Sequence, residues 1–174
     1  PDDDGAQDDR FYDWTVAENA IRFLDRADPS RRNLIQLGFK HPHYNLESPD
    51  RFYAQYDPAA IVWPSSAAPE DYFGPQPGFA VYEAAYIANG RWTPEKSGDE
   101  AWRQVVRAYF AATSHADHEI GRFMRALEAS PLGRDTTVVF LSDNGFNLGT
   151  HDSFHKMSQW DSAAHVPLAI WHAE

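Results

Sequence analysis

The sequence contains no cysteine, so this chain can form neither disulfide bonds nor cysteine-ligated zinc sites. It has no apolar run near the ~20 residues that a membrane-spanning helix needs, and its mean hydropathy is -0.60, which argues against a membrane protein. Basic residues are scarce, with 15 Lys and Arg against 26 Asp and Glu and a net charge of -11. Nucleic acids and anionic membranes attract basic surfaces, so the sequence predicts neither as a partner.

The remaining composition is that of a globular protein. Its 174 residues are 43% hydrophobic and 14% aromatic, enough for one domain with a core. Residues 1–10 are acidic and polar, so we expect a solvated lead-in there. They lack the apolar core of a signal peptide. Residues 11–174 are then part of a single domain. The chain does not start with methionine, which predicts a processed piece or a partial sequence. Periplasmic, extracellular and cytoplasmic locations are all compatible with this composition.

Hydrophobic periodicity predicts two helices and three strands. Apolar residues at helical spacing indicate a helix over 14–26, and Thr15 with Glu18 has the spacing of a capping box at its start. A second capping-box pattern at Ser97 predicts a helix from there to about residue 130. Short apolar runs predict buried strands, which cover residues 34–39, 136–142 and 166–171. The pattern indicates an α/β fold.

The most informative segment follows the strand predicted over 136–142. Asp143 and Asn144 come at the carboxyl end of that strand, where open α/β sheets bind their ligands. Both offer oxygen, which hard divalent cations prefer, and Gly145 would let the backbone turn so that both face one ion. Lys156 adds a cation nearby in the sequence. A metal beside a lysine suits a multiply charged oxyanion. An Asx-type turn without any metal is the alternative explanation of the pair by itself.

Three segments, in order, resemble the sulfatase family of the alkaline phosphatase superfamily. They are Leu37-Gly38-Phe39-Lys40-His41-Pro42-His43, the helix from Tyr109-Phe110-Ala111-Ala112 into Thr136-Thr137-Val138, and Ser142-Asp143-Asn144-Gly145 with Leu148-Gly149-Thr150-His151, Lys156-Met157 and Ala164-His165-Val166-Pro167-Leu168. Together they cover roughly residues 12–171. The resemblance implies an alkaline-phosphatase-like α/β fold, a mostly parallel sheet flanked by helices. It also implies that this fold is incomplete here, because the N-terminal half is missing.

The resemblance also implies a role for individual residues. Asp143 and Asn144 match metal ligands, Lys156 and His43 match catalytic residues that contact the sulfate, and His151 matches a position near the substrate. Relatives that cleave phosphate or phosphonate esters commonly have histidine where this chain has Asn144. Asparagine therefore favours Ca²⁺, with Mg²⁺ or Mn²⁺ as alternatives. The family's formylglycine nucleophile is expected in the missing N-terminal half, since no residue here lies in its motif.

The predicted function is the hydrolysis of a small-molecule or sugar sulfate ester. This chain would supply half of the metal and sulfate site, and the N-terminal half of the same protein would supply the rest. By itself the chain is expected to be inactive. Two alternatives stay open: a phosphodiesterase or phosphonate monoester hydrolase of the same superfamily, and a non-catalytic, sulfatase-like binding module.

Two other groups of residues allow more than one interpretation. Histidines at i and i+3 on the second helix can bind metal, but polar residues on an exposed or semi-buried face are the favoured explanation; the group is His115, Asp117, His118 and Glu119. The proline-rich segment 44–79 could line a substrate pocket or could be anchored to the core by its aromatic residues, which include Tyr44, Tyr53, Tyr56 and Trp63.

Overall fold

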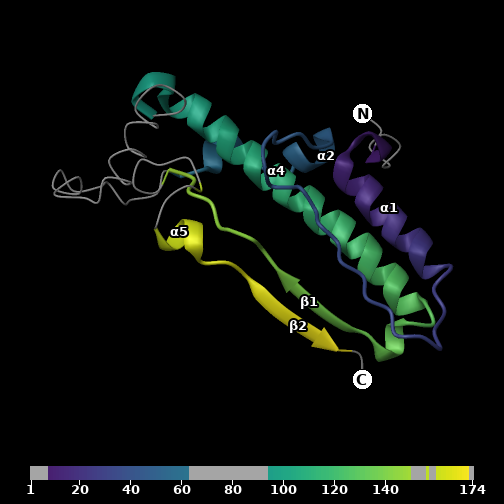
Figure 1. Ribbon diagram of the computed structural model, residues 1–174. Helices are drawn as coiled ribbons and strands as arrows, with labels where there is room; N and C mark the ends of the chain where they lie inside the picture. The colour runs from purple at the N-terminus through teal and green to yellow at the C-terminus, as the bar shows by residue number, and fades with distance from the viewer. Residues whose placement is uncertain (1–7, 63–93, 150–155, 157–159, 173–174) are drawn as a thin grey trace. The chain divides into compact units, whose positions relative to one another are not determined.

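The computed structural model describes residues 8–62, 94–149, 156 and 160–172, and of residues 94–99 only the helical backbone (Figure 1). Its elements are, in order, η1 Asp8–Arg10, α1 Tyr12–Leu24, α2 Asp50–Tyr53, η2 Pro58–Ala60, α4 Pro94–Ala129, η4 Gly133–Asp135, β1 Thr137–Leu141, α5 Asp161–Ala164 and β2 Leu168–His172. None of the helices in these ranges combines the length and apolar character needed to cross a bilayer.

The chain divides into two units. The first comprises Pro1–Asp57, Arg107–Val138 and Trp171–Glu174, and the second comprises Pro58–Val106 and Val139–Ile170. Helix α4 contributes its N-terminal part to the second unit and the rest to the first. The expectation of a solvated lead-in is wrong for Asp8. Its side chain is buried in the first unit, and its carboxylate forms an ion pair with Arg51.

Both main helices begin earlier than their capping boxes predict. Helix α1 starts at Tyr12 after an N-cap residue, Phe11, that makes no side-chain capping bond. Helix α4 starts at Pro94, where the fixed φ of proline suits a first helical residue. Its end at Ala129 agrees with the prediction. Gly133 follows closely, and a Cβ there would lie 2.5 Å from Leu127 O, so only glycine fits this turn.

The core of the first unit lies between α1 and the C-terminal part of α4. Ala20 and Leu24 are spaced four residues apart on α1 and pack against Phe123 and Leu127, which have the same spacing on α4. Partly buried apolar side chains surround this cluster, among them Ile21, Ile35, Leu37, Met124, Leu132 and Val138.

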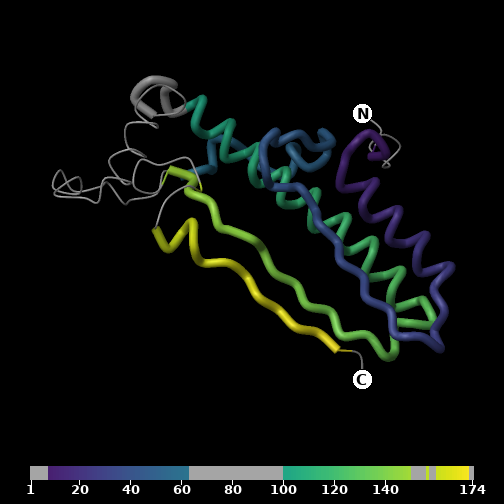
Figure 2. The backbone as a smooth tube through the Cα atoms, viewed as in Figure 1, coloured from purple at the N-terminus to yellow at the C-terminus, as the bar shows by residue number. Residues whose placement is uncertain are grey.

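The strand predicted over 34–39 does not form among the described residues. Figure 2 shows this segment running back alongside α4, and Ile35 and Leu37 pack against the core while Leu34 is 93% exposed. Side chains that alternate between the core and solvent along the chain are typical of extended backbone. The segment has no strand beside it in the described part of the chain, so its apolar residues are explained by packing on a helix.

The two strands predicted around Asp143 do form. Strands β1 and β2 are hydrogen-bonded neighbours, and Thr137 Oγ1 lies 3.0 Å from His172 Nδ1, so the first residue of β1 meets the last of β2. The pair is therefore antiparallel (Figure 1). The mostly parallel sheet stays a prediction for strands beyond this pair.

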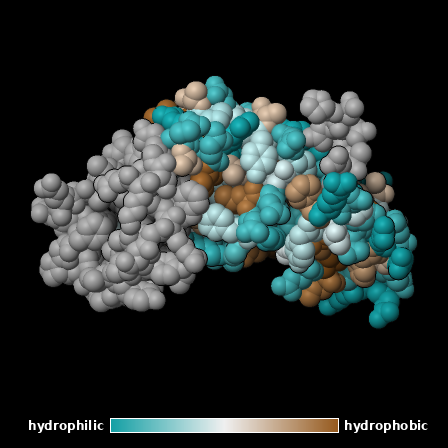
Figure 3. Space-filling model, turned by 90° about the horizontal axis from the view of Figure 1, so that it is seen from above, coloured by the Kyte–Doolittle hydropathy of each residue, from teal (hydrophilic) through white to brown (hydrophobic). Residues whose placement is uncertain are grey.

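Large apolar side chains of both strands are exposed. They are Val139, Phe140, Leu141, Leu168, Ile170 and Trp171. Figure 3 shows apolar residues at the surface among polar ones, so apolar side chains are not confined to the interior of the described part. An α/β sheet normally has both faces covered, and this pair of strands has the composition of such a sheet.

Candidate functional site

The predicted metal ligands lie directly beyond β1, in backbone that is no longer strand. Asp143 is exposed and Asn144 is half-buried. Asn144 Nδ2 donates a hydrogen bond to Gly145 O (2.8 Å), and Ser142 Oγ donates one to Asn144 O (2.9 Å). Asn144 Oδ1 accepts no hydrogen bond from the described residues. Oxygen ligands are therefore available at both positions.

Hydrogen bonds to described residues of α4 and α5 hold the loop that follows, residues 142–149. Gly145 N donates to Ala163 O (2.8 Å), Ser162 Oγ donates to Asn147 Oδ1, and Trp102 Nε1 donates to Leu148 O (3.2 Å). Asn147 is completely buried. The loop is thus fixed both to the residues around α5 and to the N-terminal part of α4.

Gly145 is required for a reason that differs from the prediction. The sequence suggested that glycine permits a sharp turn, but Gly145 does not adopt a left-handed conformation; Gly149 does, with φ of 105°. Instead, a Cβ at Gly145 would lie 2.1 Å from Ser162 O. The residue must be small because the backbone of α5 lies against it.

Lys156 is half-buried, and no described carboxylate forms an ion pair with it. Its charge is therefore not compensated by Asp143, which belongs to the same unit. The role of Lys156 at an anionic ligand stays a prediction. The predicted substrate residue His151 lies outside the described residues.

His43 is exposed, in a turn that its own backbone closes. His43 N donates a hydrogen bond to Lys40 O (2.9 Å), and His43 Nδ1 lies 2.7 Å from Tyr44 O. A carbonyl oxygen only accepts, so Nδ1 carries a proton. Nε2 is then the ring nitrogen left to accept or donate a proton toward a ligand.

Asp13, which the sequence did not single out, holds this turn from α1. It is completely buried and accepts hydrogen bonds from Lys40 N (2.6 Å), His41 N (3.0 Å) and His41 Nδ1 (2.6 Å). Burial by itself would raise the pKa of Asp13, but these bonds and the charge of His41 outweigh it and lower the pKa below 3.8. The carboxylate is therefore ionised near neutral pH.

His115 and Glu119 are completely buried, so the expectation of an exposed or semi-buried polar face is wrong for both. The His115 ring packs against Phe11 and Phe52, with centroids 5.1 and 5.2 Å away, and against His41 at 5.4 Å.

The pKa of His115 is strongly perturbed by this environment. Burial is the main cause that lowers the pKa to about 4; the charges of His41 and Arg51 also lower it, while those of Asp13 and Asp8 oppose the shift. His115 is therefore neutral over most of the physiological pH range.

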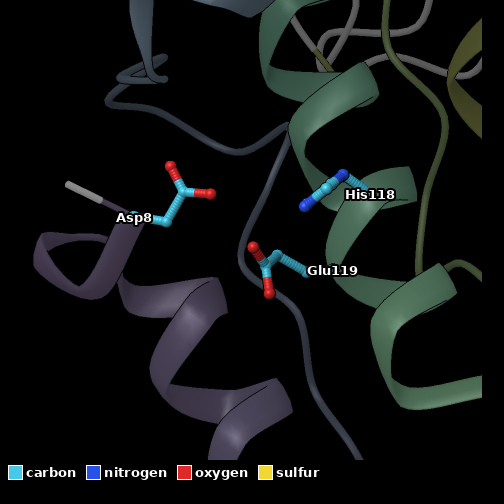
Figure 4. A group of neighbouring side chains, drawn as sticks. All are labelled: Asp8, His118 and Glu119. Atoms are coloured by element: carbon cyan, nitrogen blue, oxygen red, sulfur yellow. The ribbon is translucent and has the colours of Figure 1, made fainter. Parts of the chain in front are cut away.

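Three polar side chains lie close together beside His115. Asp8, His118 and Glu119 each offer one potential ligand atom, and these atoms lie within 4.8 Å of one another (Figure 4). Guanidinium groups already compensate both carboxylates, because Arg51 pairs with Asp8 and Arg122 lies 2.6 Å from Glu119 Oε2. The arrangement favours a structural ion-pair network over a metal centre.

The aromatic residues of segment 44–62 serve mainly as anchors. The hydroxyl of Tyr53 donates to Leu46 O (2.5 Å), and the hydroxyl of Tyr56 lies 2.5 Å from Ser114 Oγ. The Tyr56 ring also packs on Phe110, at 5.4 Å. Anchoring is therefore the better explanation for these two residues, while Trp63 lies outside the described residues.

Comparison with known proteins identifies the family. The model of the family described as Sulfatase matches residues 2–174. The chain belongs to the sulfatase family. The three segments that resemble sulfatases therefore led to the correct family, and the structure agrees with membership of the alkaline phosphatase superfamily.

Individual sulfatases give the extent of the similarity. A sulfatase of Formosa agariphila is 31% identical over 134 residues, which are 77% of this chain and 26% of that protein. An arylsulfatase of Clostridium perfringens is 29% identical over 164 residues, 91% of this chain and 31% of that protein. The sulfatase chain thus spans less than a third of the length of these relatives.

The fold is also that of a solved superfamily structure. The phosphonate monoester hydrolase of Silicibacter pomeroyi superposes with a TM-score of 0.72 and 25% identity, over 90% of this chain and 32% of that one. The sulfatase chain therefore has an α/β fold of the alkaline phosphatase type, of which it forms one part.

Proposed function

We propose that the protein containing this chain hydrolyses sulfate esters, and that the loop after β1 supplies part of its active site. The observation that carries the proposal is the loop 142–149. It is held by hydrogen bonds to Ala163, Ser162 and Trp102, yet the carboxylate oxygens of Asp143 and Oδ1 of Asn144 accept no hydrogen bond from the described residues. Fixed but unused oxygen donors are what a metal site requires before its ion binds.

These donors fit a hard divalent cation. A carboxylate and an amide oxygen suit Ca²⁺, with Mg²⁺ or Mn²⁺ as alternatives, and neither residue offers the imidazole that Zn²⁺ prefers. A bound cation would supply positive charge for the oxygens of the sulfate group. The hydrogen bond from Asn144 Nδ2 to Gly145 O fixes the orientation of the Asn144 amide group, so that Oδ1 is the atom left to bind a metal ion.

Lys156 and His43 would act on the substrate itself. The ammonium group of Lys156 would bind a sulfate oxygen and stabilise the charge that develops in the transition state. The bond from His43 Nδ1 to Tyr44 O leaves Nε2 facing the substrate, and in the doubly protonated ring Nε2 would donate a hydrogen bond or proton to the departing ester oxygen. His151 would lie near the same substrate, which we propose to be a small-molecule or sugar sulfate ester.

The remaining parts of the site would come from the rest of the same protein. This chain covers less than a third of its relatives, so we propose that the nucleophile, a formylglycine, lies outside it. The same remainder would cover the exposed apolar residues of β1 and β2, including Phe140 and Ile170, as further strands of a mostly parallel sheet.

The test is turnover by the full-length protein. We expect it to hydrolyse an aryl sulfate, and Lys156→Ala to lower kcat/KM by roughly 100-fold or more, as for the loss of an electrostatic contact in a transition state. Arg134→Ala is the matched control, since Arg134 is an exposed cation in η4. A Lys156→Ala variant as active as the control would remove Lys156 from the mechanism.

A second candidate function follows from the solved structure. Its superposition with a phosphonate monoester hydrolase makes an aryl phosphonate or phosphate diester the natural competing substrate. Faster turnover of that ester than of the aryl sulfate would favour the second function. If neither ester is cleaved but a sulfated ligand binds, the protein is a binding module and the proposal fails.

A further inference from the structure

The buried carboxylate of Asp13 is directed at the backbone of a loop far away in the sequence. Asp13 is the second residue of α1, and its partners Lys40 and His41 follow 27 and 28 residues later. One carboxylate oxygen accepts from Lys40 N, and the other accepts from both His41 N and His41 Nδ1. Two consecutive peptide groups and a ring are therefore fixed by one side chain.

The strength of this anchor comes from charge and burial together. Asp13 has no exposed surface, and His41 is 9% exposed, so water is excluded from the two bonds between them. Hydrogen bonds to an ionised acceptor are roughly twice as strong as neutral ones. Removing the charge would leave the buried His41 N–H and His41 ring nitrogen, and the part-buried Lys40 N–H, without an adequate acceptor, which is costly.

The anchor lies two residues from His43 along the chain. Pro42 joins His41 to His43 and restricts the backbone between them. The turn then closes by the bond from His43 N to Lys40 O, a residue that Asp13 also holds. Lys40, and through it Asp13, thus holds the backbone of His43, while the bond from Nδ1 to Tyr44 O orients the His43 ring.

We propose that Asp13 is a positioning residue for His43, holding the 40–43 turn so that the His43 ring meets the ester. This inference rests on the proposed function, because it needs His43 to act on a substrate. It assigns no contact with substrate to Asp13, which lies completely buried.

The first measurement tests the anchor without any activity. In the full-length protein, Asp13→Asn should accelerate amide hydrogen exchange at Lys40 and His41 by about 10-fold or more, because each loses a charged acceptor. Glu18→Gln is the control, since Glu18 lies on the same helix but pairs with Arg22 and Arg122. Unchanged exchange in Asp13→Asn would overturn the proposal.

The second measurement links the anchor to catalysis by a double-mutant cycle. Asp13→Asn should lower kcat by about 10- to 100-fold, the scale of a misplaced catalytic group, with KM changing less. In a His43→Gln background the same substitution should lower kcat no further. A purely structural role would lower kcat equally in both backgrounds and would overturn the proposal.

His41→Phe keeps the cycle decisive if Asp13→Asn does not fold. It removes only the ring bond to Asp13 and keeps the two backbone bonds, so a smaller loss of kcat that again depends on His43 is expected. Full activity of His43→Gln would overturn the role of His43 and this inference together. A His43-dependent enzyme that tolerates both Asp13→Asn and His41→Phe would overturn this inference alone.

Discussion

Trp102 Nε1 lies 3.2 Å from Leu148 O and donates a hydrogen bond to it, joining helix α4 to the loop that carries Asp143 and Asn144. Trp102 is buried, so its ring packs in the interior while its single polar atom reaches the loop. A residue far from the predicted ligands thereby contributes to their support.

Trp102→Phe should weaken metal binding without unfolding the protein. Phenylalanine keeps most of the packing but loses the bond to the loop, worth about 1 kcal/mol, so the Kd for Ca²⁺ should rise roughly fivefold. Calorimetric titration of the full-length variant with Ca²⁺ measures this. Val106→Ala is the comparison, because Val106 is a buried residue of the same helix that has no polar side-chain atom to bond the loop. Equal affinities for wild type and Trp102→Phe would show that the loop needs no such support.

Gly145→Ala should destabilise the protein, whereas Gly38→Ala should not. A Cβ at Gly145 would lie 2.1 Å from Ser162 O, a backbone atom that cannot move away easily, so we expect a loss of about 2 kcal/mol or more. A Cβ at Gly38 meets nothing within 4 Å. Unfolding by urea compares the two variants. Similar midpoints would mean that the backbone of α5 can give way.

The stability of the protein should fall between pH 6.5 and pH 4, and His115 should cause part of the fall. Burial lowers its pKa from 6.5 to about 4, so in this window the unfolded chain binds a proton that the folded chain excludes. Stability therefore decreases as the pH falls, by about 3 kcal/mol for a group of this kind.

His115→Phe should flatten this dependence, because it removes the titrating group and two ring nitrogens that have no hydrogen-bond partner among the described residues. Melting temperatures of the full-length protein across this pH range measure the slope. Leu127→Ala is the control, as a core substitution that should lower stability equally at each pH. An unaltered slope in His115→Phe would assign the pH dependence to other groups.

Asn144→His should change the preferred metal. An imidazole at this position suits Mn²⁺ or Zn²⁺, while the amide oxygen suits Ca²⁺. After chelation, wild-type activity should return with Ca²⁺, and that of the variant should return preferentially with Mn²⁺. Asn45→His is the control, because Asn45 is exposed on a loop. Asn147→His would not serve, since Asn147 is buried and bonded to Ser162. Identical metal profiles in wild type and Asn144→His would exclude Asn144 as a ligand.

Local sequence patterns predicted the elements around the loop well. The apolar run before Ser142 and the polar residues after it predicted β1, and the helix end expected near residue 130 agrees with the end of α4 at Ala129. These signals depend only on neighbours in the chain. The same is true of the family resemblance, which rests on short segments in order.

Contacts between distant residues were not predictable from such patterns. The pairing of Asp13 with His41 spans 28 residues, and no spacing rule connects a helical aspartate to a loop backbone. Gly145 was noticed, but its need for space comes from Ser162, which lies 17 positions later in the sequence. The predicted helix starts were wrong because the capping boxes lie downstream of the observed ones: α1 begins at Tyr12, after the non-capping residue Phe11, and α4 begins at Pro94.

The strands β1 and β2 leave Val139, Leu141, Leu168 and Ile170 more than half exposed. Bare, apolar strands of this kind pair readily with other copies of themselves and form aggregates. These 174 residues produced by themselves should therefore be poorly soluble whatever tag they carry, because the exposed apolar side chains that promote aggregation belong to the strands themselves. Biochemical work on the loop after β1 is best begun with the intact polypeptide.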